Sequence, residues 1–172
     1  MLVPHDMKGQ IIGVLGLGRS GLAAVAALKA AGADVFAFDD VKSQQDIPQI
    51  NLTSWHDWPW EKLEALVISP GIPHGYPMPH PAAAHAQSQQ IPIISEVELA
   101  LRAKPKARLI AITGTNGKST TTALIGHYLQ TAKCPVAIGG NLGDAACSLD
   151  DPGEHGTLVL ELSSYQLETT PS

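Results

Sequence analysis

The chain has 172 residues, of which 16% are charged, and it carries a formal net charge of −5. This length is enough to bury a core, either as one large domain or as one domain and part of another. The acidic balance leaves no broad basic surface for a nucleic-acid backbone, so we expect no nucleic-acid partner. The first ten residues lack the apolar core of a secretory signal, and no apolar run is long enough to cross a membrane. We therefore expect a cytoplasmic protein that does not associate with a membrane.

Strands and helices alternate along the first hundred residues. Short apolar runs predict strands, and the Ala-rich or Glu-flanked stretches between them predict helices. The predicted strands are 11–15, 35–38, 65–68 and 91–94, and the predicted helices are 21–31, 81–90 and 96–103. This alternation indicates an α/β fold with a parallel sheet covered on both faces, similar to a Rossmann domain.

A polar, proline-containing break at residues 104–108 predicts a linker, after which the pattern starts again. Strands are expected at 109–113, 136–138 and 157–162, with a helix at 118–131. We therefore predict a Rossmann-like domain at 1–103 and the beginning of a second α/β domain at 109–172. Three strands are few for a domain, so we expect the chain to be truncated.

The first glycine turn, Gly16 to Gly21, matches GxGxxG between a strand and a helix. Its glycines would let backbone amides approach a diphosphate, and Asp39 at the end of the next strand could bind ribose hydroxyls. NAD and a UDP-sugar both satisfy this pattern, so the residues alone leave both open. Ser69 and Gly71 follow the third strand, at the sheet edge where such folds bind ligands, although Pro-Gly turns are common there without a function.

The second glycine turn follows the strand at 109–113 and opens a helix. Gly114, Thr115, Asn116, Gly117, Lys118, Ser119 and Thr120 form most of a phosphate-binding loop, although Ile112 stands where the first glycine of that motif is usual. Lys118 would neutralise the terminal phosphates, and Ser119 could bind Mg²⁺. Glu161 ends the last strand, where a carboxylate could complete the magnesium site, and Asn141 ends another strand at the same edge.

The segment 113–120 resembles the ATP loop of the Mur ligases, which assemble the peptide stem of bacterial peptidoglycan and in which the first glycine is normally absent. Residues 161–168, read Glu-Leu-Ser-Ser-Tyr-Gln-Leu-Glu, are similar to the motif of the member that joins D-glutamate to UDP-N-acetylmuramoyl-L-alanine. The resemblance spans nearly the whole chain and includes Ser69 to Ile72 and Gly139 to Gly143.

This resemblance implies a role for each candidate residue. Gly18, Arg19 and Ser20 would lie near the UDP diphosphate, Asp39 and Asp40 near the uridine, and Ser69 and Gly71 along the same pocket. Asp40 departs from the neutral hydroxyl residue that the family has beside the uracil. Asn141, Ser163 and Gln166 would face the muramoyl-alanine end, while Lys118, Ser119 and Glu161 would hold ATP and Mg²⁺.

The implied reaction is an ATP-dependent ligation through an acyl phosphate, which the amine of D-glutamate attacks, during cytoplasmic peptidoglycan precursor synthesis. The family also has a C-terminal domain that binds D-glutamate, so we expect this chain alone to be inactive. We also expect the chain to be a monomer. Two alternatives stay open: a redox module that binds NAD through Gly16 to Gly21, and a non-catalytic nucleotide sensor.

Overall fold

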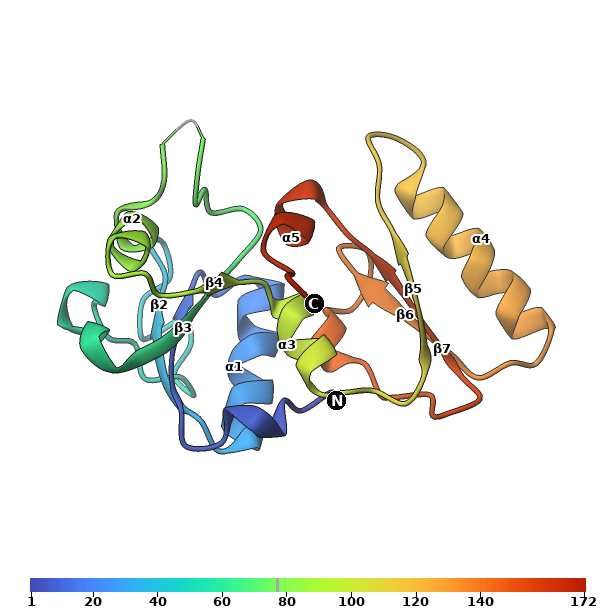
Figure 1. The fold of residues 1–172 in the computed structure, drawn as a ribbon, viewed down its shortest axis with the longest axis horizontal. Helices are drawn as coiled ribbons and strands as arrows, with labels where there is room; N and C mark the ends of the chain where they lie inside the picture. The colour runs from blue at the N-terminus through green and yellow to red at the C-terminus, as the bar shows by residue number, and fades with distance from the viewer. Residues whose placement is uncertain (77) are drawn as a thin grey trace.

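The computed structural model describes residues 1–76 and 78–172, which contain two parallel sheets (Figure 1). The first sheet has the strand order β2-β1-β3-β4. Its strands are β1 (Ile11–Leu15), β2 (Asp34–Phe38), β3 (Leu63–Ile68) and β4 (Ile93–Ile94), and its helices are α1 (Arg19–Ala31), α2 (Pro81–Ser88) and α3 (Glu96–Arg102). We call these elements the first unit. Three short 3-10 helices belong to the same part of the chain, at His5–Met7, Trp55–Asp57 and Trp60–Lys62.

Alternating side chains bury both faces of this sheet. Ile12 and Val14 of β1, and Ala65 and Val67 of β3, pack on the core formed with α1 and α3. The intervening residues of β3, Leu66 and Ile68, pack on the opposite side with α2 and Trp58. A period of two in a strand places successive side chains on opposite faces, and here both faces are apolar, as a covered parallel sheet requires.

The second sheet has the order β5-β7-β6, with all pairs parallel. Its strands are β5 (Arg108–Ile112), β6 (Val136–Gly140) and β7 (Thr157–Glu161), and α4 (Lys118–Thr131), the 3-10 helix η4 (Ala146–Ser148) and α5 (Ser164–Glu168) complete what we call the second unit. The central strand β7 is buried along its whole length. Helix α4 lies close to one face, since a Cβ on its Gly126 would come within 2.1 Å of Ile138 Cδ1.

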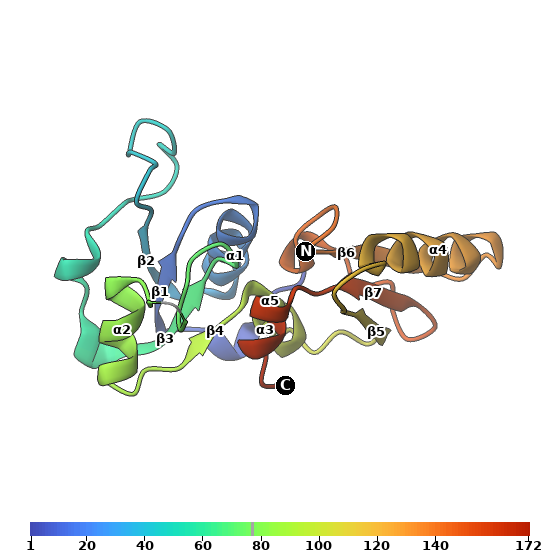
Figure 2. The same ribbon diagram turned by 90° about the horizontal axis from the view of Figure 1, so that it is seen from above.

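The layers follow one another along the long axis of the molecule. Figures 1 and 2 show α2, the first sheet, α1 with α3, the second sheet and α4 in that order. Helix η4 contacts α1 and α3, and Leu158 and Leu160 of β7 belong to the same apolar core as α1. Backbone bonds also join the units: Leu2 N–H donates to the Cys147 carbonyl at 2.9 Å and Ser95 N–H to the Thr169 carbonyl at 2.8 Å.

The predicted fold class is confirmed, with helices and parallel strands at the expected places. Helix α1 begins two residues earlier than predicted, at Arg19, and the 3-10 helices and α5 were not predicted. The division into domains at 104–108 stays a prediction. Among the described residues, no helix combines the length and the apolar character that a membrane crossing requires.

Candidate functional site

The first glycine turn is closed so tightly that two of its glycines have no room for a side chain. A Cβ on Gly21 would lie 1.8 Å from the Gly16 carbonyl oxygen, and Gly16 itself has a φ of +86°. Ser69, at the end of β3, donates its hydroxyl to the same Gly16 oxygen at 2.9 Å. Gly18 differs, since its Cβ direction is open. The turn therefore brings α1 against β1 and joins Gly18, Ser20 and Ser69 at one sheet edge.

Asp39 braces this turn from the end of β2. Its Oδ2 accepts the Leu17 N–H at 2.6 Å, and its Oδ1 accepts the N–H groups of Val41 at 3.0 Å and Lys42 at 2.9 Å. Burial raises the pKa of the Asp39 carboxyl, but these backbone donors outweigh burial and hold the pKa below its ordinary value. Among the described residues, Oδ1 accepts two of these bonds and Oδ2 accepts one, so a ribose hydroxyl could use the second acceptor position of Oδ2.

Asp40 points to the other side, toward α2. His80 Nδ1 accepts the Ala82 N–H at 3.1 Å and so caps α2, and His80 Nε2 lies 3.2 Å from both Asp40 oxygens. Because Nδ1 is an acceptor, the neutral ring carries its proton on Nε2 and donates it to Asp40. Asp40 thus has a partner within the protein, on an edge that also carries Asp39.

The second glycine turn leads directly into α4. Gly114 has a φ of +142° and Gly117, the N-cap residue, a φ of +78°, both in the region that favours glycine. Lys118 Nζ donates to the Gly114 carbonyl at 2.7 Å, while Thr115, Asn116, Ser119 and Thr120 are exposed around it. The loop opens on a cavity of about 490 Å³ that Thr113, Gly114, Thr115, Lys118, Ser163, Ser164 and Tyr165 line.

Glu161 is buried at the end of β7 and is held by the turn after β6. Asn141 Nδ2 donates to Glu161 Oε1 at 2.9 Å, and Asn141 N–H donates to the Glu161 carbonyl at 2.8 Å. The other carboxylate oxygen, Oε2, is buried without a hydrogen-bond partner among the described residues. An acceptor left in this way at a strand end fits a magnesium ligand, because a carboxylate oxygen is what that ion prefers.

Arg19 joins the first glycine turn to the turn after β6, which carries Asn141. It is the first residue of α1, and its Nη2 donates to the Asn141 carbonyl at 3.0 Å. Arg19 was predicted beside a diphosphate and Asn141 beside another part of the substrate. The structure brings both into one chain of contacts that ends at Glu161.

Ser163 and Gln166 form a capping box at the start of α5. Gln166 Oε1 accepts the Ser163 N–H at 2.9 Å, and Ser163 Oγ accepts the Gln166 N–H at 3.2 Å. Ser163 lines the cavity beside Lys118, whereas Gln166 is buried and does not line that cavity. A Ser-x-x-Gln spacing before a helix is a signal for this cap that was available in the sequence.

Tyr165 is a candidate site residue that sequence reasoning missed. It lines the cavity at Lys118 and also a smaller one, of about 170 Å³, with Pro70, Gly71, Pro73 and Tyr76. The ring therefore stands between the turn after β3 and the phosphate-type loop. Its position after Glu-Leu-Ser-Ser was the only available signal.

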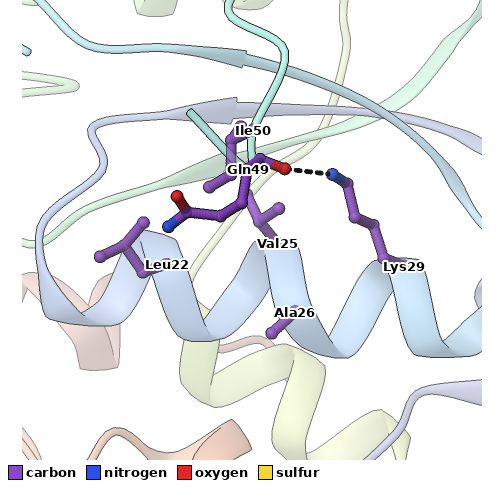
Figure 3. A pocket seen from close by; sticks show the side chains of 6 residues that line it. All are labelled: Leu22, Val25, Ala26, Lys29, Gln49 and Ile50. Carbon is purple, nitrogen blue, oxygen red and sulfur yellow. Dashed lines mark hydrogen bonds between the residues drawn. The ribbon is translucent and has the colours of Figure 1, made fainter. Parts of the chain in front are cut away.

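A third cavity of about 290 Å³ lies between α1 and residues 49–50 (Figure 3). Its walls are largely apolar, and Lys29 Nζ lies 3.5 Å from the Gln49 carbonyl that it bonds. No predicted site residue lines this cavity, and we assign it no function.

Known protein sequences match the chain across both of these turns. The model of the Mur ligase middle domain matches residues 112–171, which include Lys118, Asn141 and Glu161. The chain is 47% identical to UDP-N-acetylmuramoylalanine--D-glutamate ligase of Rhodospirillum rubrum over 180 residues, and 48% identical to the ligase of the same name from Paramagnetospirillum magneticum over 169 residues. These matches cover 99% and 96% of the chain.

The chain belongs to the Mur ligase family. A relative from Rhodopseudomonas palustris with the same printed name is 44% identical over 179 residues. The chain spans about 38% of the length of these relatives. The phosphate-type loop, with Ile112 in the place of the first glycine of the common motif, lies within the segment that the family model matches.

Proposed function

We propose that this chain serves the ATP-dependent ligation of D-glutamate to UDP-N-acetylmuramoyl-L-alanine, in cytoplasmic peptidoglycan precursor synthesis. The observation that carries the proposal is the contact chain from the first glycine turn through Arg19 and Asn141 to Glu161. It connects a turn suited to a sugar nucleotide to the end of β7, and the next residue, Leu162, bonds the carbonyl of Ile112 at the end of β5, the strand that leads into the phosphate-type loop. The relatives' printed name supplies the two substrates.

Residues 1–103 would form a domain that binds the UDP end of the substrate, and residues 109–172 would belong to the ATP-binding domain. Residues 104–108 would link the two domains. Gly18, Arg19 and Ser20 would take the diphosphate, Asp39 and Asp40 the uridine, and Ser69 and Gly71 the pocket wall. Asn141 and Ser163 would face the muramoyl-alanine end. Gln166 would support that surface from its buried position rather than line it. We propose a monomer.

Lys118 would release the Gly114 carbonyl and place its ammonium on the terminal phosphates of ATP, with the glycine amides around it. Mg²⁺, when bound, would neutralise phosphate charge, and Ser119 and Glu161 are the residues that would hold it. The two units would then position the alanine carboxylate for attack on the γ-phosphate, giving an acyl phosphate and ADP. The D-glutamate amine would attack the acyl carbon, form the amide bond and displace inorganic phosphate.

A titration separates this proposal from a redox module that binds NAD. Calorimetry of the purified chain with UDP-N-acetylmuramoyl-L-alanine should show one site per chain, and excess UDP should displace the ligand. NADH should give no saturable heat. Saturable binding of NADH without binding of the sugar nucleotide would overturn the ligase proposal and favour the redox alternative, which leaves the loop at Lys118 without a role.

A further inference from the structure

Arg19 has more hydrogen-bonding capacity than the structure uses. The guanidinium carries five N–H donors in a planar fork, and among the described residues one of its nitrogens bonds a protein acceptor, the Asn141 carbonyl. The side chain is exposed and starts α1 directly after Gly18. Its remaining donors are therefore available to an anion at the first glycine turn.

Asn141, whose carbonyl accepts the Arg19 bond, is held rigidly against Glu161. Gly140, which precedes Asn141, has a φ of +97°, and a Cβ there would lie 2.4 Å from the Glu161 carbonyl oxygen. The Asn141 backbone and side chain both donate to Glu161. A displacement of the Asn141 carbonyl would thus move the group that orients the buried carboxylate.

We propose that Arg19 is a positioning residue that couples the two nucleotide sites, by bridging a nucleoside diphosphate at the first glycine turn to Asn141 and hence to Glu161. This inference rests on the proposed function and adds a regulatory link to it. A diphosphate would fix the guanidinium by two or more charge-assisted bonds, and the fixed guanidinium would hold the Asn141 carbonyl. Binding at the first site would then tighten binding at the second.

The test measures the affinity for Mg-ADP by calorimetry, with and without saturating UDP. Because the Arg19 contact is exposed, we expect a coupling near the lower end of the usual range, so that UDP should tighten Mg-ADP about fivefold. Linkage requires that Mg-ADP tighten UDP by the same factor. Arg19→Ala should reduce both factors to about one at saturating UDP, and Arg19→Lys, which keeps the charge but loses the fork, should give a smaller factor than the wild type.

Lys29→Ala is the matched control, since it removes a positive charge from the same helix without touching either turn, and it should keep the fivefold coupling. Equal melting temperatures of the variants would exclude a folding effect. Independent binding of UDP and Mg-ADP in the wild type, or coupling that survives Arg19→Ala, would overturn this inference and leave the proposed function standing. Failure of both ligands to bind would overturn the proposed function, and the coupling with it.

Discussion

Gly21 shows how a single residue decides whether the first turn can close. Its missing side chain lets the Gly16 carbonyl approach α1, and Ala at this position would put a Cβ 1.8 Å from that oxygen. We expect Gly21→Ala to lower the free energy of unfolding by on the order of 3 kcal/mol, through overpacking that the backbone must relieve. Gly18→Ala is the control in the same turn, because its Cβ meets nothing within 4 Å and its φ is −68°. Urea unfolding of both variants measures the difference, and similar losses would contradict the packing described for the turn.

Glu96 is a buried carboxylate between α3 and η4 whose charge costs stability. Its Oε1 accepts the Cys147 N–H, but Oε2 is buried without a hydrogen-bond partner among the described residues. Burial raises the pKa above its ordinary value of 4.5, against smaller lowering effects of the Cys147 and Ala146 backbone and of the Arg19 charge. A raised pKa favours the folded state below the unfolded value, and this advantage is lost as the pH rises through the folded value.

Glu96→Gln, whose side chain stays neutral at every pH, should therefore become increasingly more stable than the wild type as the pH rises above 4.5. Urea unfolding at several pH values measures the difference. Glu154→Gln, in an exposed turn, should show the same change of stability with pH as the wild type. A difference between Glu96→Gln and the wild type that is constant with pH would show that Glu96 is not held in the environment described.

Helix α5 depends on the cap at its N-terminus. It has five residues, too few to be stable alone, and the Ser163–Gln166 capping box satisfies N–H groups at its start. We expect Ser163→Ala to cost about 1 kcal/mol locally, which would lower the hydrogen-exchange protection of the Leu167 amide about fivefold. Ser164→Ala, one residue further on an exposed side chain, should leave that protection unchanged. Equal effects of the two substitutions would speak against the cap.

The strands and long helices could be predicted because each is a local pattern. Apolar runs such as 11–15 and 157–161 carry their own signal, and the glycine turns mark where helices begin. Helix α5 was missed because five residues with few apolar side chains give no period, although the cap was visible. Arg19 and Asn141 are 122 residues apart, and no spacing rule brings them together. Their contact follows from the packing of η4 against α1 and α3, which only the folded chain reveals.

At the scale of the whole molecule, the two cysteines report on how the units pack. Cys134 is exposed after α4, whereas Cys147 is buried where η4 meets α3, and its thiol donates to the Glu96 carbonyl at 3.3 Å. Burial, and then the nearby Glu96 charge, raise the pKa of Cys147 well above its ordinary value. A thiol-reactive dye should therefore modify one cysteine rapidly in the native chain and the second only in denaturant. Rapid modification of both would mean that the units separate readily.

The central claim for the whole molecule is that the loop at Lys118 binds the phosphates of a nucleotide. Calorimetry with Mg-ADP, on the wild type and on Lys118→Ala, tests it most directly. We expect one site per chain and a loss of affinity of about tenfold or more in the variant, since a charge-assisted contact is removed. Lys8→Ala, at an exposed lysine outside both turns, should bind as the wild type does. Equal affinities in the wild type and Lys118→Ala, or no binding of Mg-ADP to either, would contradict the assignment of this loop.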